Sequence, residues 1–82
     1  MSDLPDLQPI HSLEVLTSRR YRRNYEYWSS QTTERIVKSL ALGHRESLTI
    51  KPDGRVVQGN TRITILLQRG YDVKTLPREI KP

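Results

Sequence analysis

The fold of this chain is decided by the stretch Asp53-Gly54-Arg55-Val56-Val57-Gln58-Gly59-Asn60-Thr61-Arg62. Asp53-Gly54 is a strong turn signal, and the β-branched run after it predicts a short strand that ends at Gly59. A helix is expected to begin at once, over residues 61–69. The first N–H groups of such a helix lack partners within it, and together with the helix dipole they favour an anion. The stretch therefore predicts a phosphate site between strand and helix.

The candidate residues for this site are Gly59, Asn60, Thr61 and Arg62. Gly59 lets a ligand approach the backbone, while Asn60 or Thr61 caps the helix and donates hydrogen bonds. Arg62 supplies a charged, forked donor that suits phosphate oxygens. The alternative is an ordinary strand-to-helix turn with a solvated Arg62.

The segments before this stretch predict a flexible lead, a strand and a helix. Residues 1–10 contain two prolines and no periodic pattern, so we expect a flexible lead. Residues 11–17 alternate imperfectly between apolar and polar, which predicts a first strand. Residues 31–42 show the helical spacing of apolar side chains, with a cap at Ser29-Ser30 and a stop at Gly43.

The remaining segments complete a compact α+β domain. Residues 47–58 predict a hairpin, Gly70 ends the second helix, and a last short strand is expected near residues 74–76. The expected fold is α+β, a small mixed sheet packed against two main helices, with residues 11–82 as a single domain. The predicted core residues are Ile36, Val37, Leu40, Leu48, Ile50, Val56, Ile63, Leu66 and Leu67.

Length and composition limit the classes of function. The 82 residues suffice for one small domain, and without cysteine there is no disulfide, zinc–thiolate site or thiol nucleophile. No apolar run approaches a membrane span and the acidic N-terminus is unlike a signal peptide, so we expect a cytoplasmic protein without a membrane partner. The formal net charge of +5 favours a polyanionic partner, a nucleotide or nucleic acid, although simple solubility also explains it.

An arginine- and aromatic-rich segment precedes the first predicted helix, and we expect a loop or a short irregular helix there. Its arginines, the candidates for nucleic-acid binding, are Arg19, Arg20, Arg22 and Arg23. Its rings are Tyr21, Tyr25, Tyr27 and Trp28. In the functional interpretation the arginines contact phosphates and the rings stack on bases. In the alternative the arginines are solvated and the rings fill a core that has no phenylalanine.

No motif for catalysis or metal binding stands out. The two histidines, His11 and His44, are far apart, and Glu34, Glu46 and Asp53 lack the paired spacing of a two-metal nuclease. Glu46, just before the hairpin, is the least explained carboxylate. We therefore assign no catalytic residue and no metal.

The order of strand, helix, hairpin, turn and helix resembles the ParB/sulfiredoxin-like domain over roughly residues 10–76. The stretch from Leu48 to Gly70 carries nearly all of this resemblance, and Gly59-Asn60-Thr61-Arg62 matches the family's Gly-x-x-Arg motif. The resemblance implies a nucleotide phosphate at this turn. ParB proteins bind CTP and centromeric DNA, sulfiredoxins use ATP, and some relatives are described as nucleases.

Departures from the family pattern narrow what the resemblance implies. Sulfiredoxin chemistry needs a cysteine in this motif, and the chain has none, which excludes a sulfinic-acid reductase. The sequence ends at Pro82, before the helix-turn-helix domain with which ParB proteins read DNA, so we expect a stand-alone module. The Arg19–Arg23 group takes a place comparable to the Arg-rich box of partition proteins, with different spacing.

The resulting prediction is a ParB-like module that binds a phosphate-bearing ligand, a nucleotide or a nucleic-acid backbone, at Gly59–Arg62. The cofactor that the resemblance implies is a nucleoside triphosphate, CTP or ATP. Two alternatives stay open. One is a ParB-like nuclease or nucleotide hydrolase, which requires a carboxylate or histidine beside Arg62. The other is a small regulator that binds a protein partner through exposed rings of the Tyr/Trp-rich segment 21–28.

Overall fold

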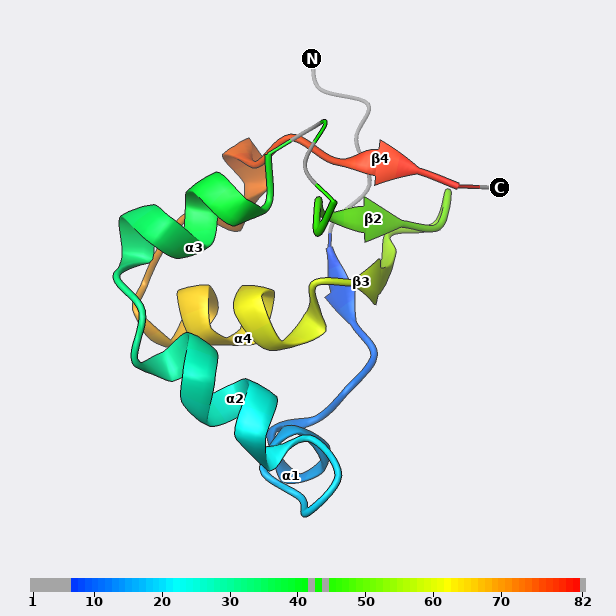
Figure 1. Ribbon diagram of the computed structural model, residues 1–82. Coiled ribbons are helices and arrows are strands. Elements are labelled where there is room, and N and C mark those ends of the chain that lie inside the picture. Colours follow the sequence, from blue (N-terminus) through cyan, green and yellow to red (C-terminus); the bar gives the residue numbers. More distant parts are fainter. Residues whose placement is uncertain (1–6, 42, 44, 82) are drawn as a thin grey trace.

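A four-stranded mixed sheet forms one side of the computed structural model, which describes residues 7–41, 43 and 45–81 (Figure 1). The strand order is β1-β3-β2-β4, with β2 antiparallel to β3 and the edge strands β1 and β4 parallel to their neighbours. The strands are β1 (Gln8–Pro9), β2 (Thr49–Ile50), β3 (Arg55–Gln58) and β4 (Glu79–Ile80).

The helices pack beside this sheet, and α4 lies between α2 and α3 (Figure 1). They are α1 (Leu13–Leu16), α2 (Arg22–Ser29), α3 (Thr33–Ser39), α4 (Asn60–Gln68) and the 3₁₀ helix η1 (Val73–Thr75). The expected α+β class with a small mixed sheet is thus confirmed. The expectation of two main helices omitted α2, which is as long as α3 and packs on α4.

The predicted hairpin is confirmed, and its turn shows why. The N–H of Gly54 donates to the Lys51 carbonyl at 2.9 Å, and Gly54 has φ 98°. The Asp53 carboxylate accepts from the backbone N–H of Arg55 at 3.1 Å and from its side-chain Nε at 2.8 Å. These hydrogen bonds, with the charge of Arg55, lower the pKa of Asp53. Local chemistry therefore sets the register of β2 against β3.

The prediction of a strand over residues 11–17 is wrong. Ser12 accepts a hydrogen bond from the Val15 N–H at 3.2 Å and so caps the short helix α1. Leu16 is the residue that α1 buries, while Leu13 and Val15 are exposed. The first strand, β1, falls within the expected lead 1–10, because the Gln8 N–H donates to the Gly54 carbonyl at the hairpin turn. Residues 1–6 of that lead lie outside the described residues.

The arginine- and aromatic-rich segment, for which a loop or a short irregular helix was expected, forms the regular helix α2. Trp28 is buried and Tyr25 half-buried against the core, which holds α2 in place despite its arginines. Ser30 is the C-cap of α2, so the predicted cap at Ser29-Ser30 is wrong; Thr32 caps α3 through the Arg35 N–H at 3.1 Å.

The predicted stop of the first helix at Gly43 is approximate. Helix α3 ends at Ser39, and Gly43 follows with φ 84° in the left-handed region.

The last predicted strand, near residues 74–76, is also wrong. The Asp72 carboxylate accepts from the Lys74 N–H at 3.1 Å and starts η1 there. The strand forms instead at β4, where the Glu79 N–H donates to the Leu48 carbonyl at 2.8 Å. A two-residue edge strand carries no periodic pattern, so only its partner strand shows where it lies.

The predicted core is largely confirmed. Ile36, Leu40, Leu48, Ile50, Val56, Ile63 and Leu66 are all buried. Val37 is half-buried, and Leu67 is half exposed, so its assignment to the core is wrong. Ile65 is buried on α4 where Leu67 is not, because α4 is enclosed by α2 and α3 as well as by the sheet. The core also includes Leu16, Trp28, Val73 and Leu76.

Candidate phosphate-binding site

The junction between β3 and α4 is a single residue, Gly59. Its φ of 109° lies in the region that favours glycine, and an added Cβ would meet Leu40 Cδ2 at 3.2 Å and Leu48 Cδ1 at 3.4 Å. Gly59 occupies the N-cap position, and no side chain caps α4 there. The expectation that Asn60 or Thr61 is the cap is therefore wrong, because both lie inside the first turn of the helix.

The side chains of Asn60 and Thr61 are buried and form hydrogen bonds with other parts of the chain. The Asn60 amide accepts from the Ile10 N–H at 2.8 Å and donates to the Val56 carbonyl at 2.9 Å. The Thr61 hydroxyl accepts from the Asn24 amide at 3.2 Å. Both side chains thus fix the walls of the site, and the first-turn backbone N–H groups are the donors that a ligand would meet.

Arg62 is 4% exposed, which is unusual for a charged side chain. Its Nη1 donates to the Ser39 hydroxyl at 3.1 Å and to the Ser39 carbonyl at 3.4 Å. Its guanidinium carbon lies 5.1 Å from the centre of the Trp28 ring, a cation–π contact. Burial lowers the pKa of Arg62, and the charge of Glu46 partly offsets this effect.

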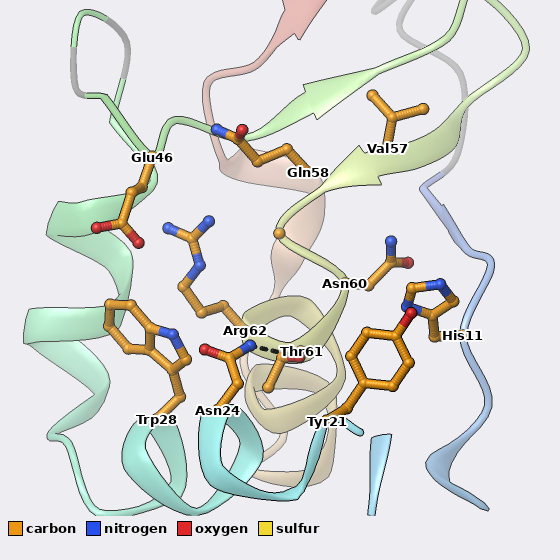
Figure 2. Close-up of a pocket in the computed structure, with 11 residues that line it drawn as sticks. His11, Tyr21, Asn24, Trp28, Glu46, Val57, Gln58, Asn60, Thr61 and Arg62 are labelled. Atoms are coloured by element: carbon orange, nitrogen blue, oxygen red, sulfur yellow. Dashed lines mark hydrogen bonds between the residues drawn. The ribbon is translucent and has the colours of Figure 1, made fainter. Parts of the chain in front are cut away.

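The Arg62 guanidinium keeps donors for a further partner. Among the described residues, no carboxylate lies within ion-pair distance and no hydrogen bond is made by Nε or Nη2. In that part of the chain, every fully enclosed side-chain nitrogen has a hydrogen-bond partner. Because Nε and Nη2 of Arg62 have no such partner, they are not fully enclosed and are open to the adjoining cavity. In Figure 2 the guanidinium points between Glu46 and Gln58, above Trp28.

A cavity of about 230 Å³ lies at the N-terminus of α4, and we call it the Arg62 cavity. It is lined by His11, Tyr21, Asn24, Trp28, Glu46, Val57, Gln58, Gly59, Asn60, Thr61 and Arg62. All four predicted phosphate-binding residues therefore meet at one cavity. Figure 2 shows Arg62, Trp28 and Glu46 on one side of it, and His11 and Tyr21 on the other.

Several lining residues were not among the residues predicted for the phosphate site. His11 lies with its ring centre 5.1 Å from that of Tyr21. Tyr21 was considered only as a ring that stacks on bases, and His11 has no sequence signal for this position. Asn24 and Trp28 are four residues apart on α2, a helical spacing that would have linked them had α2 been recognised. Glu46, the carboxylate without an explanation in the sequence, lies beside Arg62 in the same cavity.

The Arg19–Arg23 group lies apart from the Arg62 cavity. Arg19, Arg22 and Arg23 line a separate cavity with Glu26, and Arg22 pairs with Glu26 at 3.0 Å. Arg20 stacks over Tyr21 at 5.5 Å and is the member nearest the site. All four arginines are exposed, and their role in nucleic-acid binding stays a prediction.

Metal-binding clusters and membrane-spanning helices are both absent from the described ranges 7–41, 43 and 45–81. No group of three or more His, Asp or Glu side chains there is placed to hold a metal ion. No helix within those ranges has both the length and the apolar character that crossing a membrane requires. His44, one of the two histidines of the sequence, lies outside the described residues.

No protein-family model, curated protein or solved structure matches the chain.

Proposed function

We propose that the chain binds a phosphate-bearing ligand, a nucleotide or a nucleic-acid backbone, in the Arg62 cavity. The observation that carries this proposal is the buried guanidinium of Arg62, with donors open to the cavity and no ion pair within the described residues. In its assigned role, Arg62 binds phosphate oxygens through Nε and Nη2. The first N–H groups of α4 bind the same phosphate.

The energetics of Arg62 support this role. Burying an unpaired charge costs several kcal/mol in effective terms, because water no longer solvates it. The Ser39 contacts and the Trp28 ring offset part of that cost. Glu46 supplies part of a countercharge, a phosphate in the cavity would supply more, and the dipole of α4 would add about 0.3–1 kcal/mol. The site thus presents a positive charge that an anion would complete.

The resemblance to the ParB/sulfiredoxin-like domain supports the same proposal. Gly59 and Arg62 keep the spacing of the family's Gly-x-x-Arg motif, and both line the cavity. We propose accordingly that the α+β fold is of the ParB/sulfiredoxin type and that CTP and ATP are the first nucleotides to test. The cytoplasmic location expected from the sequence stays a prediction.

The experiment is a calorimetric titration of the protein with inorganic phosphate, CTP, ATP, single-stranded DNA and duplex DNA at two salt concentrations. Binding of at least one of these ligands is expected, and any nucleic-acid binding should weaken steeply with salt. Arg62→Gln should weaken binding at least tenfold, since charged hydrogen bonds contribute about 1.5–3 kcal/mol.

The matched control is Arg55→Gln, which removes an exposed arginine outside the cavity and should leave binding almost unchanged. Because Arg62 is buried, circular dichroism must show that the Arg62 variant is folded. Arg62→Lys provides a second variant, which keeps the positive charge but loses the two-pronged donor geometry of the guanidinium group. If a folded Arg62 variant binds every ligand as tightly as the parent, or if none of the ligands binds the parent, the proposal is wrong.

A second candidate function is hydrolysis of a phosphate ester, and Glu46 favours it. A carboxylate beside Arg62 is what the nuclease or nucleotide-hydrolase alternative requires, and Glu46 lines the cavity. Incubation of the parent protein with the ligand and Mg²⁺ or Mn²⁺ should then release hydrolysis products. The Glu46→Gln variant should not form them.

The remaining alternative, a protein-binding ring surface, has less support. Trp28 is buried, Tyr21 and Tyr25 are half-buried, and Tyr27 alone of the four rings of segment 21–28 is exposed.

A further inference from the structure

A second cavity adjoins the Arg62 cavity and extends it. This cavity lies between α2 and α3, has a volume of about 520 Å³ and shares Asn24, Trp28 and Glu46 with the first. Its other lining residues are Tyr27, Arg35, Lys38 and Ser39. Ser39 is also the residue to which Arg62 donates. The two cavities therefore adjoin, from the N-terminus of α4 along the side of α2, and we call the pair the extended groove.

The far part of this extended groove is cationic and carries an exposed ring. Arg35 and Lys38 lie three residues apart on α3 and thus on one face of the helix. In the described part of the chain neither forms an ion pair with a carboxylate, although Arg35 donates to the Tyr27 hydroxyl at 3.4 Å. Tyr27 is 48% exposed, and its ring makes an edge contact with the Trp28 ring at 5.1 Å between ring centres. Positive charge beside an exposed aromatic residue is suited to a nucleotide chain.

We infer that the extended groove binds single-stranded nucleic acid, with one phosphate at Arg62, another at Arg35 and Lys38, and a base against Tyr27. This inference rests on the proposed function and names its ligand class. A free nucleotide has no phosphate for the far cations once its own phosphates occupy the Arg62 cavity. Glu46 belongs to both cavities, so its repulsion places the two phosphates on either side of it.

The recessed position of Arg62 favours a single strand over a duplex. Arg62 is 4% exposed and the Arg62 cavity is small, about 230 Å³. A flexible strand can turn one phosphate into such a recess, whereas the phosphates of a stiff duplex stay on its outer surface. Unpaired bases also leave their faces open for Tyr27.

The experiment compares thymidine monophosphate with a thymidylate hexamer, which has little structure of its own. The hexamer should bind the parent protein at least tenfold more tightly than the monophosphate. Arg35→Gln combined with Lys38→Gln should weaken hexamer binding about tenfold and leave monophosphate binding within twofold. The salt dependence of hexamer binding should also fall, by about 0.7 in log–log slope for each phosphate that the variant no longer neutralises.

The matched control is Lys74→Gln combined with Lys81→Gln, which removes the same charge at exposed positions outside both cavities. This control should weaken hexamer binding by less than the groove variant does.

The outcomes separate the two proposals. If monophosphate and hexamer both bind independently of Arg62, the proposed phosphate site fails and the groove assignment fails with it. If monophosphate binding depends on Arg62 but the hexamer binds no more tightly, the phosphate site stands and the groove assignment is wrong. Equal binding of a duplex of the same length, or equal loss in the groove and control variants, also overturns the single-strand assignment.

Discussion

At the scale of single residues, Arg62 combines a structural role with the binding role that we propose for it. One edge of its guanidinium is held by Ser39 and its face lies against Trp28, so the side chain has a fixed orientation. Nε and Nη2 are not fully enclosed, and Arg62 lines the cavity. A ligand of the kind that we propose would therefore meet a preorganised arginine and would not have to order a flexible one, which lowers the entropic cost of binding.

Glu46 allows a test of charge at the same site. Its carboxylate lies in the Arg62 cavity and repels phosphate, so Glu46→Gln should tighten phosphate binding by roughly two- to fivefold at low salt. Titration with inorganic phosphate measures the effect. The control is Glu34→Gln, an equal charge change on α3 that lines a different cavity. Weaker binding by the Glu46 variant would assign that carboxylate a direct contact with the ligand.

Asn60 is expected to stabilise the fold rather than bind ligand. Asn60→Ala leaves the Ile10 N–H and the Val56 carbonyl without their partner, which should lower the free energy of unfolding by about 1–3 kcal/mol. Asn24→Ala removes a single hydrogen bond to Thr61 and should cost about 1 kcal/mol or less. Urea denaturation compares the two variants, and equal losses would contradict the anchoring role of Asn60.

At the scale of the elements, the β3–α4 junction is the most constrained point of the backbone. Gly59→Ala forces an alanine into a positive-φ backbone conformation, which costs about 1–2 kcal/mol of folding free energy. The added Cβ also makes a tight contact with Leu40 and Leu48. Gly70→Ala has similar strain at φ 77°, but nothing lies near the added Cβ. Chemical denaturation should therefore show a larger loss for Gly59→Ala. Equal losses would mean that the neighbours of Gly59 move aside without cost.

The connection between α2 and α3 depends on a residue of a third element. Arg69, the C-cap of α4, donates to the carbonyls of Ser29 and Gln31 and to the Thr33 hydroxyl, each at 3.0 Å. Arg69→Ala should therefore lower the free energy of unfolding by about 1–2 kcal/mol.

The control for Arg69 is Arg22→Ala, which removes an exposed pair with Glu26 and should cost about 0.3–0.5 kcal/mol. Both values come from urea denaturation. Similar small losses in the two variants would show that the Arg69 contacts do not hold the α2–α3 connection.

At the scale of the whole molecule, the local part of the fold was predictable and the long-range part was not. The hairpin and α4 follow from Asp53-Gly54 and Gly59, whose turn chemistry acts on neighbouring residues. The two edge strands, β1 and β4, exist because the hairpin offers them backbone partners, and two residues give no pattern to recognise. Sequence reasoning therefore placed the centre of the sheet and missed its edges.

The candidate site also has a local part that was predictable from the sequence and a long-range part that was not. Gly59 to Arg62 were predicted because one continuous stretch contains them, but the opposite wall comes from residues far along the chain. Asn24 meets Thr61 across 37 residues, and Ser39 meets Arg62 across 23. The need of a core without phenylalanine for these rings predicted a structural role for Trp28, and Trp28 is indeed buried. The helical spacing that brings Asn24 to the same cavity was not recognised, because arginines surround both residues.

Ligand binding should stabilise the whole fold, because the extended groove joins α2, α3, α4 and the segment before α1. At a hundred times its dissociation constant, a ligand specific for the folded state adds about 2.7 kcal/mol. Thermal unfolding with the thymidylate hexamer should therefore show a higher midpoint for the parent protein and a smaller rise for Arg62→Gln, because a tenfold weaker affinity reduces the stabilisation to about 1.4 kcal/mol at the same ligand concentration. A rise of the same size in both would show that the hexamer binds elsewhere.

The stacking of Arg62 on Trp28 has a spectroscopic consequence. The chain has one tryptophan, and its indole ring lies against the cation assigned to the phosphate. An anion bound to that cation would change the electric field across the ring. The intrinsic fluorescence of the protein should therefore report binding at the proposed site, with no label attached and no second tryptophan to dilute the signal.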